Sequence, residues 1–337
     1  MDSEDGGSPR TEAVLKDMPK LAAVQDNRIA EPTEAEAYDL HADDIHNFRA
    51  FLRSLLMHGA IGTTLGGCSS GVGQPQNLVI ARYLEWDFVA FFLKMLPITA
   101  IVLPMGLITC VILEQSKVFG YGQEMPKHVR KVLSTFADDE YGKIHNAEVA
   151  ELMIQGIGAI FLVLGLALHV TEVGFVGLAI TVYVTAFNGI VEEHEVADAF
   201  MEAMPFVSLL VVFFGVVSII QDQAIFEPII DGVLALEKDQ QPPMLFVTNG
   251  LLSMVSDNVF VATVFIKGVA GAYENQGVNG TMTRDHYETL AVSINMGTNL
   301  PSCATPNGQA AFLFILTSSI SPLVHLTYGT MVKMAFP

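Results

Sequence analysis

A single acidic side chain, Asp257, stands in the middle of an otherwise apolar segment, residues 240–266. An ionisable group is costly in such a setting, so its presence there indicates a function. Its neighbours Ser256 and Asn258 add polar oxygens, and a proton and a cation could compete for the one carboxylate. We therefore expect proton-coupled cation binding here; the alternative is that Asp257 lies near water and only caps a short helix.

Two polar segments interrupt other apolar runs, and each contains residues that end helices. These residues are Gly66, Gly67, Gly73 and Pro75 in the first segment and Pro301, Pro306 and Gly308 in the second. Each run should therefore break into two half-helices whose freed carbonyls, together with side-chain oxygens, could bind a dehydrated alkali cation. The candidate ligands beside Ser256, Asp257 and Asn258 are Thr63, Asn77, Asn295, Thr298, Asn299, Thr305 and Asn307.

The two interrupted segments resemble each other. Residues 62–74 and 297–309 share the pattern GTxLxxCxxxxGQ, and a second match follows in order, Lys94-Met95-Leu96-Pro97 against residues 333–337. Two matches in the same order indicate an internal duplication. By the same offset, the position equivalent to Asp257 is Ala22, inside an acidic segment, so we expect the first copy's hairpin and its N-terminal helices to be missing.

Composition indicates the environment of these segments. The chain has 337 residues, of which 51% are hydrophobic and 16% charged, against roughly 25% charged in soluble domains. Several uncharged runs approach or exceed the ~20 residues that cross a bilayer. They are residues 54–81, 95–113, 152–171, 173–191, 203–221 and 289–332. We predict an all-α polytopic membrane protein whose partner is the lipid bilayer and not a nucleic acid.

The basic residues of 114–151 place this linker in the cytoplasm, since cytoplasmic loops carry the excess of Lys and Arg. Residues 1–47 would then be an acidic, disordered cytoplasmic tail, and 48–113 the end of a first repeat. The second repeat, 152–337, would hold three spans, a re-entrant hairpin and the start of a last span near Lys333. The predicted elements are a broken helix at 52–83, spans at 95–113, 152–171, 173–191 and 203–221, the hairpin at 223–270 and a broken helix at 286–320.

This topology sends the two broken helices in opposite directions, which is the inverted-repeat arrangement of secondary transporters. No enzyme is expected. The segment Gly67-Cys68-Ser69-Ser70-Gly71 fits the GxSxG pattern, but Gly73 and Pro75 follow it where a nucleophile elbow needs a helix. A phosphate-binding loop would need a Lys-Ser/Thr that these glycines lack, and a cofactor is not expected.

Three long segments, 62–81, 251–266 and 294–318, are similar to the NhaB sodium/proton antiporters of the ion-transporter superfamily. The resemblance extends in order from about Phe48 to Pro337 and covers the later two-thirds of such a chain. It implies Na⁺/H⁺ exchange across a bacterial inner membrane, with Na⁺ and H⁺ as the transported ions. It also implies that Ser256, Asp257 and Asn258 form a hairpin tip, and it leads us to expect an acid where this chain has Gln74.

Three interpretations remain open from the sequence. The chain could be a Na⁺/H⁺ antiporter, or the part of one that carries the second ion site. It could be a sodium-coupled anion symporter of related fold, although neither break contains an Arg or Lys to hold the anion. It could also be a non-transporting fragment that needs a partner chain for the missing helices. A homodimer is a further option.

Overall fold

The computed structural model describes residues 34–141, 146–190, 192–223, 225–277 and 282–337, and in these ranges it is helical without strands. The chain divides into two compact units, residues 1–48 with 124–144 and residues 49–123 with 145–337. Within the first unit, the described segments are the start of α2 (Glu34–Gly67) and α5 (Lys127–Tyr141). All other described elements belong to the second unit, which holds both interrupted helices.

One segment that we expected to be disordered is helical in part. Helix α2 begins at Glu34, so residues 34–47 are not the unstructured end of an acidic tail, and residues 1–33 lie outside the described ranges. A helix that meets water on its faces needs no continuous apolar run, so its charged side chains gave no sign of it in the sequence. The linker 114–151, for which we predicted no secondary structure, contains α5 and the first residues of α6 (Asn146–Ala167).

The next helices are long and apolar. They are α4 (Phe88–Ser116), α6, α7 (Val173–Phe187) and α8 (Glu193–Asp222). Among the described residues, α4 and the Val149–Ala167 part of α6 are long and apolar enough to cross a membrane. Helix α7 has only 15 residues, about 22 Å at 1.5 Å per residue, so it is shorter than the span we expected at 173–191.

The surfaces of these helices are apolar. Large hydrophobic side chains of α4, α6 and α7 are exposed, among them Ile101, Met105, Phe161 and Leu178. A soluble protein rarely exposes contiguous apolar surface of this extent, whereas lipid-facing helices do. Helices α6 and α7 pack on each other, with the rings of Phe161 and Tyr183 edge to face at 6.1 Å.

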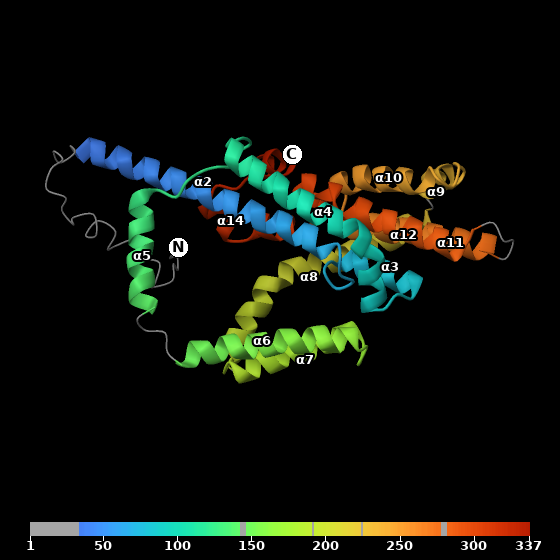
Figure 1. The fold of residues 1–337 in the computed structure, drawn as a ribbon, viewed down its shortest axis with the longest axis horizontal. Coiled ribbons are helices and arrows are strands. Elements are labelled where there is room, and N and C mark those ends of the chain that lie inside the picture. Colours follow the sequence, from blue (N-terminus) through green and yellow to red (C-terminus); the bar gives the residue numbers. More distant parts are fainter. Residues whose placement is uncertain (1–33, 142–145, 191, 224, 278–281) are drawn as a thin grey trace, which may run out of the picture. The chain divides into compact units, whose positions relative to one another are not determined.

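A helix pair fills the region where a hairpin was expected. The short helix α9 (Glu227–Leu234) precedes α10 (Gln241–Val255), and α11 (Asn258–Gly277) follows after two residues. Helix α10 packs along α12 (Arg284–Asn299), and α11 packs on both α12 and α3 (Pro75–Leu84), as Figure 1 shows. The hairpin therefore contacts half-helices from both interrupted segments.

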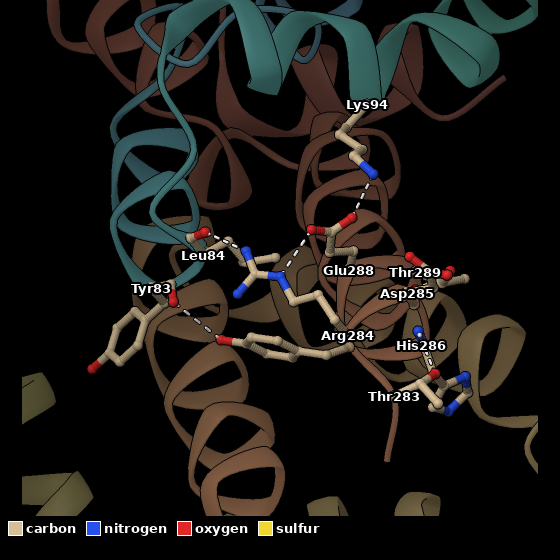
Figure 2. Close-up of polar contacts among 10 residues, drawn as sticks. Tyr83, Leu84, Lys94, Thr283, Arg284, Asp285, His286, Glu288 and Thr289 are labelled. Carbon is tan, nitrogen blue, oxygen red and sulfur yellow. Dashed lines mark hydrogen bonds and ion pairs between the residues drawn. The ribbon is translucent and has the colours of Figure 1, made fainter. Parts of the chain in front are cut away.

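A polar network connects the first turns of α12 and α4 to the end of α3 (Figure 2). Glu288 of α12 bonds Lys94 of α4 and lies 2.9 Å from Nε of Arg284, whose guanidinium also donates to the Leu84 carbonyl at the end of α3. Partial burial alone would lower the pKa of Arg284, but the hydrogen bond and charge of Glu288 raise it. Tyr287 adds two contacts to this network. Its hydroxyl donates to the Tyr83 carbonyl, and its ring stacks on the Tyr273 ring with the ring centroids 4.5 Å apart.

Replacing Glu288 with Gln should weaken this polar network without unfolding the protein. The Glu288 side chain is mostly buried while its two cationic partners are half-exposed, so we expect a loss of about 1 kcal/mol. Thermal unfolding in detergent would measure it, and a double-mutant cycle with Lys94→Gln would isolate the pairwise contribution. Additive effects of the two substitutions would contradict the ion pair.

Candidate ion-binding site

Both expected helix interruptions are present, and both are short. Helix α2 ends at Gly67 and α3 begins at Pro75, where the ring occupies a first-turn position that needs no N–H donor. Helix α12 ends at Asn299 and α13 begins at Ala310. Between them lie two 3₁₀ turns, η1 (Pro301–Ala304) and η2 (Pro306–Gly308).

The two interruptions share local contacts. In the first, the Cys68 thiol lies 3.0 Å from the Leu65 carbonyl, and in the second the Cys303 thiol lies 2.8 Å from the Leu300 carbonyl. A Cβ placed on Gly73 would lie 2.3 Å from the Gly67 carbonyl oxygen, and one on Gly308 would lie 2.3 Å from the Ser302 oxygen. These pairs occupy equivalent positions in the repeated pattern, so the two interruptions share local backbone geometry as well as sequence.

The hairpin tip carries the acid. Asp257 is 7% exposed, and its Oδ1 accepts hydrogen bonds from the backbone N–H groups of Val259 at 2.9 Å and Phe260 at 3.1 Å. These are the contacts of a helix N-cap, so Asp257 starts α11 as well as placing a carboxyl group at the tip. Asp257 therefore caps a helix, as the alternative interpretation expected, and it is also buried; ion binding at its carboxyl group stays a prediction.

Beside the acid, one asparagine joins the two interruptions. Nδ2 of Asn258 lies 3.4 Å from Oε1 of Gln74 and 3.3 Å from Oε1 of Gln309. These two glutamines are the last matched residues of the repeated pattern, and both are buried. The hairpin tip thus contacts equivalent positions of both copies at once.

Asn299 is the centre of the remaining contacts between α12 and α3. Its Nδ2 donates to Oδ1 of Asn77 at 3.1 Å and to the Asn295 carbonyl at 2.7 Å, while its Oδ1 accepts from Gln76 at 2.9 Å. The side chain of Asn77 in turn donates to the Gly67 carbonyl at 2.8 Å, and this bond connects α3 to the end of α2 across the first interruption. The result is a buried carboxamide cluster formed by Gln74, Gln76, Asn77, Asn258, Asn295, Asn299 and Gln309.

Several buried oxygens in and beside this cluster have no hydrogen-bond partner. They are Oε1 of Gln76, Oδ1 of Asn258, Oδ1 of Asn249 and Oγ of Ser253. A buried polar atom without a partner costs free energy, so native proteins rarely leave one unless water or an ion meets it. Oxygens of this kind are the ligands that hard alkali cations prefer. The arrangement therefore suits a small monovalent cation.

The structure separates the candidate ligands into two groups. Asn77, Asp257, Asn258, Asn295, Thr298 and Asn299 are buried in the second unit around the interruptions. Thr305 and Ser256 lie at its edge, where the Thr305 hydroxyl donates to the Met254 carbonyl at 2.6 Å.

Two candidates lie outside the buried cluster. Thr63 is exposed and its hydroxyl donates to the Gly59 carbonyl of its own helix, and Asn307 is exposed on η2. A role of either residue in ion binding stays a prediction.

Sequence reasoning missed four residues that line the site: Gln76, Gln309, Asn249 and Ser253. Gln309 carried a signal, because it is matched with Gln74 in the repeat. Asn249 and Ser253 are four residues apart and so share one face of α10. The sequence held no signal for their place, which depends on contacts between distant segments: a Cβ on Gly297 would lie 3.0 Å from the Asn249 Cβ, and one on Gly308 would lie 2.4 Å from the Ser253 carbonyl oxygen.

Replacing Asn299 with Leu should destabilise the fold by about 2–3 kcal/mol, because Gln76 and Asn77 lose their partner in a buried setting. Unfolding in detergent, followed by circular dichroism, would measure the loss. The matched control is Asn307→Leu in the same interruption, where exposure predicts a change within about 0.5 kcal/mol. Equal effects of the two substitutions would contradict the cluster.

The described residues contain no group of three or more His, Cys, Asp or Glu that could hold a metal ion. Exposed apolar helices, two interrupted helices and a buried polar cluster are the features of an all-helical membrane protein. The chain belongs to the family described as "Bacterial Na+/H+ antiporter B (NhaB)", whose model matches residues 18–337. The resemblance seen in the sequence is thereby confirmed, and the family is one of integral inner-membrane proteins.

Curated relatives agree with this family. The Na(+)/H(+) antiporter NhaB of Marinobacter nauticus is 56% identical over 305 residues, covering 90% of this chain and 60% of the relative. The protein of the same name from Pseudomonas entomophila is 54% identical over 313 residues, covering 91% and 62%. That of Saccharophagus degradans is 55% identical over 300 residues, covering 89% and 59%. The chain thus spans about three-fifths of their length. No solved structure matched the chain.

Proposed function

We propose that this chain forms the ion-site-bearing part of a transporter that exchanges Na⁺ for H⁺ across the inner membrane. The observation that carries the proposal is the buried carboxamide cluster, with its unpartnered oxygens, beside the single carboxyl group of Asp257. The names of the relatives support the choice of ions. No Lys or Arg belongs to the cluster, which argues against the alternative of an anion symporter.

The exchange follows from competition at Asp257. When its carboxyl group is ionised, its negative charge and the oxygens of Asn258 and Gln76 bind one Na⁺. When a proton arrives at the carboxyl group, the charge is lost and the Na⁺ leaves, since neutral amides alone hold a cation weakly. Alternating access of the site to the two sides of the membrane then makes the two ions move in opposite directions.

The membrane topology is part of the same proposal. The two interrupted helices are inverted copies, α10 and α11 form a re-entrant hairpin, and the chain's N-terminal side lies in the cytoplasm. The basic segment with Lys127, Arg130 and Lys131 supports this orientation, since α5 carries its charge at the surface. The shared contacts of Cys68 and Cys303 support the duplication.

The proposal is tested in everted membrane vesicles from a host that lacks its own antiporters. A fluorescent probe of the pH gradient reports proton release when Na⁺ is added. We expect exchange when this chain is joined to the part of the Marinobacter nauticus relative that it does not match. Equal addition of choline chloride is the control. A joined protein that is inserted and folded but gives no Na⁺-dependent signal would contradict the function.

A further inference from the structure

Helix α5 (Lys127–Tyr141) has one apolar face. Val129, Val132, Leu133 and Phe136 recur at intervals of three and four, so they lie along one side of the helix. We call this side the α5 stripe. Leu133 is 45% exposed and Phe136 48% exposed, so the residues that the structure describes leave the stripe largely uncovered. The apolar side of an amphipathic helix normally packs on other apolar material.

The other residues in the first half of α5 are basic. Lys127, His128, Arg130 and Lys131 are all exposed. With roughly 100° between successive residues, Lys127 and Lys131 lie opposite the stripe, and His128 and Arg130 lie at its two borders. Long basic side chains can keep their alkyl parts on apolar material while their charged ends reach a polar layer. The α5 stripe is thus bordered by positive charge.

The order of charge along α5 is unfavourable for an isolated helix. Its first turn contains basic residues and no acid, and its last turn contains no base. The helix dipole favours the opposite order, with acids at the N-terminus and bases at the C-terminus. A helix of 15 residues is marginal in water even when its charges are favourable. We therefore expect α5 to gain stability from a partner that suits bases at its N-terminal end.

Chain length keeps α5 near the membrane. The membrane-type helix α4 ends at Ser116, ten residues before α5, and the membrane-type part of α6 begins at Val149, with seven residues between. The first connection is held at Tyr121, whose hydroxyl donates to the Met334 carbonyl at 2.9 Å. The remaining residues 122–126 span at most about 18 Å when fully extended. A helix on such short connections stays within reach of the membrane surface.

We propose that α5 is an interfacial helix that docks on anionic glycerophospholipids in the leaflet where α4 ends. The α5 stripe would lie at the boundary between headgroups and acyl chains, and Lys127, Arg130 and Lys131 would bind lipid phosphates. Basic amphipathic helices bind membranes through buried apolar area together with attraction to anionic lipid. Anionic lipid would thereby fix the connection between α4 and α6 at the membrane surface. This inference does not rest on the exchange of Na⁺ for H⁺.

Residues 1–33 are the alternative partner within this chain. They carry seven acids, but four bases are interspersed among them, which leaves a net charge of −3. A bilayer surface with anionic lipid instead offers an apolar layer directly beside a dense anionic layer, which matches both faces of α5. We therefore favour lipid, and the experiment includes a chain that lacks residues 1–33.

The test follows the exposure of a dye on each face of α5. Leu133→Cys and Ser134→Cys form the pair, because these neighbours lie on different faces, and each is made with Cys68, Cys110 and Cys303 replaced by Ala. The purified chain, labelled at the new cysteine, is placed in lipid nanodiscs. The discs contain phosphatidylcholine alone or with roughly one-third phosphatidylglycerol. Acrylamide is the quencher because it is neutral, so the charge of the lipid does not change its local concentration.

We expect phosphatidylglycerol to lower quenching of the Leu133→Cys dye at least about threefold and to leave the Ser134→Cys dye unchanged. About 0.5 M KCl should reverse this protection, because it screens exposed charges. Equal quenching of the Leu133→Cys dye in both kinds of disc would overturn the proposal. Protection that requires residues 1–33 would also overturn it, in favour of a contact within the chain.

Charge variants test the basic side chains directly. Lys127→Gln with Lys131→Gln removes two charges at exposed positions, so the amount of folded protein should be unchanged. Each basic residue near an anionic surface changes binding roughly fivefold, so the ratio of docked to undocked helix should fall about 25-fold. The matched control, Lys127→Arg with Lys131→Arg, keeps both charges and should keep the protection. Protection retained by the Gln pair, or lost by the Arg pair, would contradict binding of lipid phosphates by these side chains.

Discussion

Replacing Asp257 with Asn should abolish Na⁺-driven proton release by the joined transporter while leaving the amount of folded protein unchanged. The Asn side chain keeps an oxygen that can accept from Val259 and Phe260, so the cap of α11 survives within about 0.5 kcal/mol. What the substitution removes is the group that carries a proton in one state and a negative charge in the other. Exchange measured in everted vesicles should fall to the choline background.

Two further variants separate charge from structure in that experiment. Asp257→Ala removes both the charge and the cap, so it should lose activity and also about 1 kcal/mol of stability. Asp239→Asn makes the same change of charge at an exposed position outside the cluster and should exchange ions normally. Wild-type exchange by Asp257→Asn would remove this carboxyl group from the mechanism, whatever the outcome for the other two.

The second large effect is expected at Gly308, where Gly308→Ala should displace the hairpin from the second interruption. The new methyl group would lie 2.3 Å from the Ser302 oxygen and 2.4 Å from the Ser253 oxygen, and both are backbone atoms that cannot move independently. Forced overpacking of this kind costs about 1–3 kcal/mol, at the upper end where the backbone must shift. The hydrogen bond from Thr305 to Met254 would be strained at the same time.

Thermal unfolding of the purified protein in detergent would measure that loss. Gly62→Ala is the control, because Gly62 lies close before the first interruption, whereas Gly308 lies inside the second, and a Cβ on Gly62 would meet nothing within 4 Å. In a helix, alanine is favoured over glycine by up to about 1 kcal/mol, so this control should be neutral or slightly stabilising. Equal melting of both variants would contradict the close approach of α10 to the second interruption.

The helices and their interruptions were predictable because they depend on neighbouring residues. A long run without charge favours a membrane helix, and Gly73, Pro75, Pro301 and Pro306 are clustered with other polar and small residues, where a helix is hard to continue. Single prolines such as Pro97 and Pro104 instead lie inside α4. The repeated pattern and the long motifs likewise identify the family, because both are read directly from the order of residues. The same local reasoning failed at residues 34–47, which are rich in acidic residues and form the start of α2 although they show no apolar pattern typical of a helix.

The membership of the site could not be predicted in the same way. Thr63 and Thr298 are matched residues with the same local pattern, yet one is exposed and the other buried, because α10 covers only the second. Gln76 and Asn299 are far apart in sequence and become partners only when α3 meets α12. The sequence shows which residues are polar, but it does not show which distant helix packs against them.

The sequence alone therefore determined the class of protein, its family, the two points where helices break and the one carboxyl group in an apolar setting. Only the tertiary structure decided that Asp257 caps α11, that Asn258 contacts both Gln74 and Gln309, and that Thr63 and Asn307 are exposed outside the carboxamide cluster. The physical reason is that helix formation and helix breaking are set by backbone conformation within a few residues. The identity of a buried neighbour is instead set by which distant surfaces pack with the least loss of contact and hydrogen bonding.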